Sequence, residues 1–140
     1  MQACYRKLHR YKYQLMDDYS IQIDIKPVQN IEFTFVSLSS EGLLTLRKHY
    51  AWDGPSGPTI DTRSFMRGSL VHDALYQLMR LGALGHKIYR KRADEIMKEI
   101  CLEDGMFWFR AWYVYQALRI FAGGAARPQE EPEVEIICVP

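Results

Sequence analysis

The chain has 140 residues, of which 48% are hydrophobic and 25% charged, and its formal net charge is +1. This length and composition are typical of one soluble globular domain that can bury a sizeable core. The near balance of acidic and basic residues gives no support for general nucleic-acid binding. We therefore interpret the short basic runs at 6–12 and 86–92 as solvated faces.

The cysteines, Cys4, Cys101 and Cys138, are odd in number and lack metal-finger spacing. This favours a reduced, cytoplasmic setting. The first seven residues lack the apolar run of a signal peptide, so we expect no secretion by that route. The most hydrophobic stretch, 106–122, is interrupted by two arginines and predicts a buried or partner-facing helix, with no transmembrane segment.

The first third of the chain predicts β structure. Apolar and polar residues alternate within 11–25 and again within 31–36, which is the pattern of half-buried strands. A turn at 39–42 precedes a third short strand over 43–50, and a glycine- and proline-rich turn follows at 52–58. We expect two or three antiparallel strands here.

From residue 61 onward the apolar spacing becomes helical. We predict three helices, over 63–79, 89–102 and 108–121, and expect the aromatic-rich third helix to lie against the sheet. Asp61, Thr62 or Ser64 is expected to cap the first helix, and glycines follow all three.

The fold class predicted from these elements is α+β, a small N-terminal antiparallel sheet packed on about three helices. Residues 1–124 form the single predicted domain. Residues 125–140 form an acidic, proline-containing linker and tail, in which 134–139 alternate weakly. That last stretch predicts an edge strand or an arm that docks on a partner.

His72, Tyr76 and Asp94 are the candidate catalytic residues. His72 and Tyr76 lie one turn apart on the first predicted helix, facing an apolar interior, and Asp94 lies beside the apolar stripe of the second. A histidine, the adjacent Asp73 and an aspartate from another helix can orient an imidazole or hold a metal. The alternative is a buried histidine satisfied by Asp94 or a carbonyl, with Tyr76 in the core.

The turn at 52–58 is a candidate calcium loop. Its two glycines and two prolines fix the backbone and direct its carbonyl groups. Carbonyls and a nearby carboxylate are ligands that calcium prefers. The hypothetical site combines Asp73 with the backbone carbonyls of Trp52 and Gly54. The alternative is a structural turn that joins sheet to helix, with Asp53 as a local cap.

Aromatic residues form a band on the third predicted helix, namely Phe107, Trp108, Phe109, Trp112, Tyr113 and Tyr115. The interpretation that we favour is core packed against the sheet. The alternative is an interface with another copy of the chain or another protein, because aromatic residues are enriched in interface cores.

Four ordered motifs resemble a phage- and prophage-associated family known as domain-of-unknown-function family 1353. They are the loop at 53–58, His72-Asp73-Ala74-Leu75-Tyr76, residues 93–97 and residues 115–123. An extra Gly-Pro in the loop and Met97 in place of an aromatic residue depart from the family pattern.

The family resemblance implies a phage-encoded structural or interaction protein, a component of the tail or head–tail region of the virion. Such a protein would occupy the host cytoplasm during infection or be part of the virion. We expect it to bind other phage structural proteins, or its own copies, through the aromatic helix at 106–122 and the tail at 134–139.

A more distant likeness is to phospholipase A₂, where a helical H-D-x-x-Y supplies the catalytic base and a calcium-binding aspartate. His72, Asp73, Tyr76 and Asp94 occur in the corresponding order, although the cysteine framework is absent and the loop is a poor copy. This likeness implies the alternative function, a calcium-dependent phospholipase-like or other ester hydrolase with His72 as general base.

Overall fold

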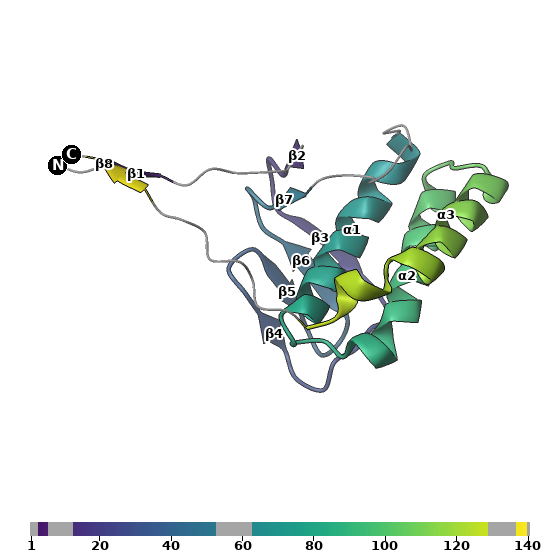
Figure 1. Ribbon diagram of the computed structural model, residues 1–140, viewed down its shortest axis with the longest axis horizontal. Helices are drawn as coiled ribbons and strands as arrows, with labels where there is room; N and C mark the ends of the chain where they lie inside the picture. The colour runs from purple at the N-terminus through teal and green to yellow at the C-terminus, as the bar shows by residue number, and fades with distance from the viewer. Residues whose placement is uncertain (1–2, 6–12, 53–62, 129–136, 140) are drawn as a thin grey trace.

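The computed structural model describes residues 3–5, 13–52, 63–128 and 137–139. The predicted α+β class is confirmed: small antiparallel sheets come first in the chain and three helices follow (Figure 1). The helical elements are α1 (Arg63–Arg80), α2 (His86–Glu103), α3 (Trp108–Phe121) and the short 3₁₀ helix η1 (Gly123–Ala126). Within the described residues, no helix combines the length and hydrophobicity needed to cross a membrane.

The largest sheet has four antiparallel strands, and its buried face supplies much of the core. In spatial order they are β3 (Tyr19–Gln22), β6 (Leu43–Leu46), β5 (Val36–Leu38) and β4 (Ile31–Glu32). Leu38, Leu44 and Leu46 alternate with more exposed neighbours and are fully buried, as the period of two along a strand requires. A separate pair joins β2 (Tyr13–Gln14) to β7 (Ala51–Trp52).

The strands are shorter and more numerous than the sequence predicts. The strand expected over 11–25 is two strands, β2 and β3. Of the strand expected over 43–50 only β6 forms, and β7 begins directly after that range. Between β6 and β7 the chain turns at His49, which has a positive φ of 81°, while the Lys48 N–H donates to Asp18 Oδ1. Alternation identifies the buried face, but it does not mark where such turns interrupt the ladder.

The helices agree closely with the prediction. α3 has the predicted bounds, α1 extends one residue further, and α2 begins at His86, three residues early, because Gly85 supplies the extended N-cap conformation. Gly82 and Gly105, which follow α1 and α2, have φ values of 75° and 96°, which glycine adopts at little cost. Asp61 and Thr62 lie outside the described residues, and Ser64 lies within α1.

The core joins the sheet to α1 and α2, and the two helices approach closely at Gly68. A Cβ atom there would lie 2.7 Å from the Cys101 sulfur and 3.2 Å from the Met97 carbonyl oxygen. Near this crossing the Arg67 guanidinium makes a bidentate hydrogen bond to Asp104, at 2.9 and 3.0 Å. The relative position of α1 and α2 is therefore fixed by close packing and by a paired charge.

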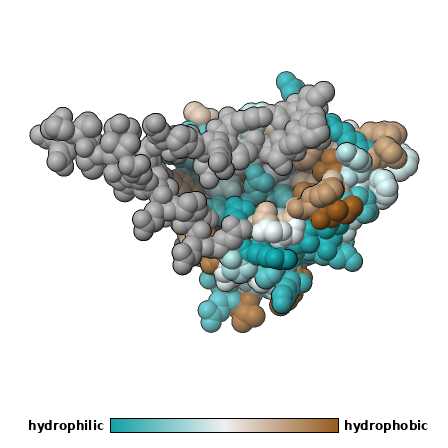
Figure 2. Space-filling model, viewed as in Figure 1, coloured by the Kyte–Doolittle hydropathy of each residue, from teal (hydrophilic) through white to brown (hydrophobic). Residues whose placement is uncertain are grey.

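The prediction that the aromatic band of α3 forms core against the sheet is wrong. α3 packs on its neighbours through a narrow stripe of aliphatic residues at helical spacing, Ala111, Val114 and Leu118. The aromatic side chains lie on the rest of the helix surface and are 48–66% exposed: Phe107, Trp108, Phe109, Trp112 and Tyr113. Figure 2 shows hydrophobic side chains at the surface on the right side of this face, where α3 lies.

The described part of the predicted tail strand pairs with the start of the same chain. β8 (Ile137–Val139) and β1 (Ala3–Tyr5) form an antiparallel ribbon in which Cys4 is opposite Cys138. Figure 1 shows this ribbon apart from the helices. The strand therefore does not extend the edge of the four-stranded sheet, and residues 134–136 lie outside the described part.

Candidate functional site: a buried carboxylate joined to three helices

α1 places His72 and Tyr76 together on its inner face. The residues are four positions apart, so their side chains stack along the helix, with ring centroids 4.1 Å apart. Both are buried, and only 6% of His72 is exposed. The predicted common face is therefore present in the structure.

α2 presents Asp94 directly to these two rings, and Asp94 is completely buried. Its Oδ1 lies 2.8 Å from His72 Nε2 and accepts a hydrogen bond of 2.6 Å from the Tyr76 hydroxyl. Its Oδ2 accepts a hydrogen bond of 2.9 Å from Arg119 Nη1, on α3. This carboxylate of α2 thus contacts both α1 and α3, and its charge is compensated by the donors around it.

Arg90 completes this network from α2. Its Nε donates to the Tyr76 hydroxyl at 3.2 Å and lies 4.0 Å from Asp94 Oδ2. Its Nη2 donates to the carbonyl oxygens of Leu118 and Arg119, at 2.6 and 3.1 Å, near the C-terminus of α3. These carbonyls carry the negative end of the helix dipole, which a guanidinium stabilises.

Sequence reasoning did not assign Arg90 or Arg119 to the site. Arg90 precedes Asp94 by four residues, a spacing at which oppositely charged side chains are neighbours on a helix. That signal was available from the sequence. Arg119 reaches Asp94 only because α3 packs against α2, and nothing local to Arg119 predicts this contact.

The surroundings of His72 and Asp94 shift both pKa values. Burial alone would lower the pKa of His72, but the carboxylates of Asp73 and Asp94 outweigh burial, and the pKa rises above its ordinary value. Burial alone would raise the pKa of Asp94, but hydrogen bonds from His72, Tyr76 and Arg119 outweigh it, and that pKa falls. Asp94 is therefore an anion around neutral pH.

The network determines which nitrogen of the neutral His72 ring carries the proton. Because the Asp94 carboxylate only accepts hydrogen bonds, the contact at Nε2 requires an N–H on that nitrogen. Nδ1 then bears the lone pair. Its charged neighbour is Asp73 Oδ1, at 3.9 Å. An imidazole held in this way can accept a proton at Nδ1.

The described residues include only part of the predicted calcium site, Asp73 and Trp52. Asp73 offers one partly exposed carboxylate. Trp52 is in β7, where its indole Nε1 donates to Ser69 Oγ at 3.3 Å, and Gly54 lies outside the described residues. In the ranges described there is no group of three or more histidine, cysteine, aspartate or glutamate side chains suited to a metal. The calcium site therefore stays a prediction.

No protein-family model, curated protein or solved structure matches this chain. The resemblances noted in the sequence motifs accordingly stay predictions, and the functional proposals below depend on the geometry of the site.

Proposed function

We propose that this protein is a hydrolase of ester bonds in which His72 is the general base. The proposal depends on one observation, the 2.8 Å contact between His72 Nε2 and the buried Asp94 carboxylate. That contact orients the ring, fixes the tautomer and leaves Nδ1 to receive a proton. Asp94, in turn, is positioned by Tyr76 and Arg119, at 2.6 and 2.9 Å.

The reaction would proceed by attack of water on the ester carbonyl carbon. His72 Nδ1 takes one proton from the water as its oxygen bonds to that carbon, which gives a tetrahedral oxyanion and an imidazolium. Asp94 stabilises the imidazolium through the hydrogen bond at Nε2. As the tetrahedral species collapses, the carbon–oxygen bond to the alcohol breaks and Nδ1–H protonates the leaving oxygen. The products are a carboxylic acid and an alcohol, and His72 is neutral again.

The test is ester hydrolysis by the wild type and by His72→Gln, with p-nitrophenyl butyrate and phosphatidylcholine vesicles as substrates. We expect the variant to lose at least about 100-fold in rate, the usual contribution of a general base. The matched control is His49→Asn, an exposed histidine with positive φ that asparagine tolerates. A rate unchanged in His72→Gln, or absent from the wild type on both substrates, contradicts the proposal.

Nitrogen NMR of His72 gives a readout that is independent of the substrate. We expect the neutral ring to carry its proton on Nε2, and we expect Asp94→Asn to allow the other tautomer, because an amide can donate to Nε2 as well as accept from it. A neutral wild-type ring protonated on Nδ1 would remove the lone pair that the mechanism needs.

A second candidate function, an interaction protein, is favoured by the aromatic face of α3, defined as Phe107, Trp108, Phe109, Trp112 and Tyr113. Single exposed apolar residues are ordinary, but a group of large aromatic side chains on one helix is typical of an interface. A second copy of this chain is the simplest partner. The role in a phage particle, with other phage structural proteins as partners, depends only on the sequence resemblance.

Sedimentation velocity tests this second candidate. We expect the wild type to form a dimer whose population rises with concentration, and we expect Trp108→Arg with Trp112→Arg to be monomeric. The control is Met16→Arg, because Met16 is also an exposed apolar residue but lies between β2 and β3. A wild type that is monomeric at every concentration excludes self-association through this face.

A further inference from the structure

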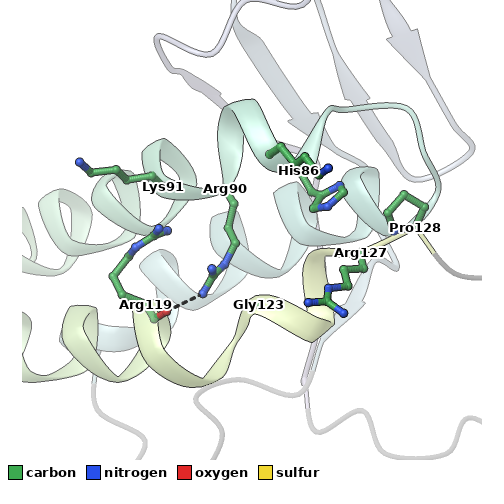
Figure 3. Close-up of a pocket in the computed structure, with 8 residues that line it drawn as sticks. His86, Arg90, Lys91, Arg119, Gly123, Arg127 and Pro128 are labelled. Atoms are coloured by element: carbon green, nitrogen blue, oxygen red, sulfur yellow. Dashed lines mark hydrogen bonds between the residues drawn. The ribbon is translucent and has the colours of Figure 1, made fainter.

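A basic cavity lies beside the Asp94 network, between α2, the C-terminal end of α3 and η1. Its volume is about 610 Å³. Six of its eight lining residues are basic, and none is acidic (Figure 3). The basic residues are His86, Lys87, Arg90, Lys91, Arg119 and Arg127.

Within the part of the chain that the structure describes, little of this positive charge is compensated by acidic neighbours. Lys87, Lys91 and Arg127 are exposed, and none of them makes an ion pair within the described part of the chain. Among the described residues, the one carboxylate that pairs with a lining residue is Asp94, which is fully buried and already accepts three hydrogen bonds. Since the whole chain has a formal charge of only +1, the cavity concentrates positive charge that is balanced elsewhere.

Two of the guanidinium groups are held in position before any ligand arrives. Arg90 is fixed by hydrogen bonds to Tyr76 and to two carbonyls of α3, and Arg119 is fixed by Asp94. Gly123 lets Arg90 approach the backbone, because a Cβ at that position would be 3.3 Å from Arg90 Nη1. Fixed guanidinium groups lose less entropy on binding, and they match phosphate oxygens in geometry.

We propose that this cavity binds a small ligand that carries two or more phosphate groups. Its volume lies within the range of about 300–1,000 Å³ typical of small-molecule sites. The lining residues include no phenylalanine, tyrosine or tryptophan on which nucleic-acid bases would stack. Adjacent phosphates provide several anionic oxygens within one small volume. This matches a cavity whose cations come from α2, from α3 and from Arg127, directly after η1. The proposal does not depend on hydrolysis at His72.

Calorimetric titration with inorganic pyrophosphate tests the site. We expect saturable binding at one site, weakened about tenfold or more by Arg127→Glu and by Lys87→Glu. Lys48→Glu is the matched control, because it makes the same change in net charge at an exposed lysine in the turn between β6 and β7. It should change the affinity by less than about twofold. No saturable binding up to about 5 mM pyrophosphate overturns the proposal, as does equal weakening by Lys48→Glu.

Gly123→Ala provides a variant without any change of charge. The added methyl group would displace the Arg90 guanidinium, so binding should weaken about fivefold while the helical circular-dichroism signal stays unchanged. Unchanged binding would show that the position of Arg90 does not matter and would contradict a preorganised site. A single-stranded oligonucleotide could also compete with pyrophosphate and bind more tightly. That result would overturn the proposal, because the ligand of the cavity would then be nucleic acid.

Discussion

At the scale of single residues, the chemistry converges on one carboxylate. Asp94 is completely buried, and both of its oxygens accept hydrogen bonds from side chains on other helices. Transferring an ion out of water costs several kcal/mol, which such donors and nearby positive charge offset. The arrangement is therefore sensitive to the removal of any one member.

Asp94→Asn should strongly destabilise the fold, since the amide keeps the shape but loses the charge that faces Arg119 and His72. We expect a loss of about 2–4 kcal/mol in the free energy of unfolding, measured by urea denaturation. Asp24→Asn is the matched control, because Asp24 pairs with Arg92 at the surface. It should cost less than about 1 kcal/mol. Equal losses in the two variants would contradict a special role for the buried carboxylate.

The pH dependence of stability follows from the opposite shifts of two pKa values. The pKa of His72 is raised in the fold, so its contribution is complete below its ordinary value of 6.5 and is lost as pH rises through the folded pKa. The pKa of Asp94 is lowered, so its contribution is present above 3.8 and is lost as pH falls through the folded pKa. The free energy of unfolding of the wild type should therefore fall as pH rises through the folded pKa of His72. In His72→Gln, measured by urea unfolding across pH 5–9, this fall should be absent.

The hydrolysis rate of the proposed enzyme should increase with pH, whereas the contribution of His72 to stability decreases. Nδ1 accepts a proton only when the ring is neutral, so the hydrolysis rate should rise with pH, with a midpoint above 6.5. The deprotonation that creates the base therefore also weakens the ion pair with Asp94. A midpoint below 6.5 would contradict the upward shift in the pKa of His72.

At the scale of elements, the approach of α1 to α2 depends on Gly68. Gly68→Ala should destabilise the fold by about 1–3 kcal/mol, because the new methyl group would meet the Cys101 sulfur and the Met97 carbonyl. Cys101→Ala removes the nearer of these atoms. In a double-mutant cycle followed by thermal unfolding, the two substitutions together should cost less than the sum of the single changes. Strict additivity would show that α1 and α2 do not meet tightly there.

The sequence predicted elements well where glycines and apolar spacing agree. Gly82 and Gly105 follow α1 and α2 in left-handed conformations, and the buried positions of α2, such as Ala93 and Ile100, repeat at helical spacing. The sequence predicted α3 but not which side of it is exposed. Apolar side chains occur all around this helix, so their periodicity does not reveal which of them contact α2. The turn at His49 was missed because no glycine or proline occupies it.

For the candidate site, the sequence predicted what local spacing determines. His72 and Tyr76 share a face because they are four residues apart, and the pairing with Asp94 followed from its place beside the apolar stripe of the next helix. The basic cavity was missed, since the run at 86–92 resembles an ordinary solvated surface. Only tertiary packing brings Arg119 and Arg127 to the same place.

At the scale of the whole molecule, three regions have different physical characters. The His72–Asp94 pair is buried among helices, the basic cavity opens beside α2, α3 and η1, and the aromatic face covers much of α3. A near-neutral chain with a cluster of cations in one place and a cluster of aromatic side chains in another has two surfaces with different binding preferences. Charge-reversing and apolar-to-charged substitutions should therefore affect different partners.

The distribution of the tryptophans gives the protein an internal optical reporter. Trp52 is 7% exposed in the core, whereas Trp108 and Trp112, on the aromatic face, are 65% and 48% exposed. Native emission should therefore be dominated by indoles in contact with water. A partner that covers α3 would move that emission to shorter wavelengths while the fold stays intact, whereas unfolding would move the Trp52 contribution to longer wavelengths. The direction of the spectral change alone distinguishes association from denaturation.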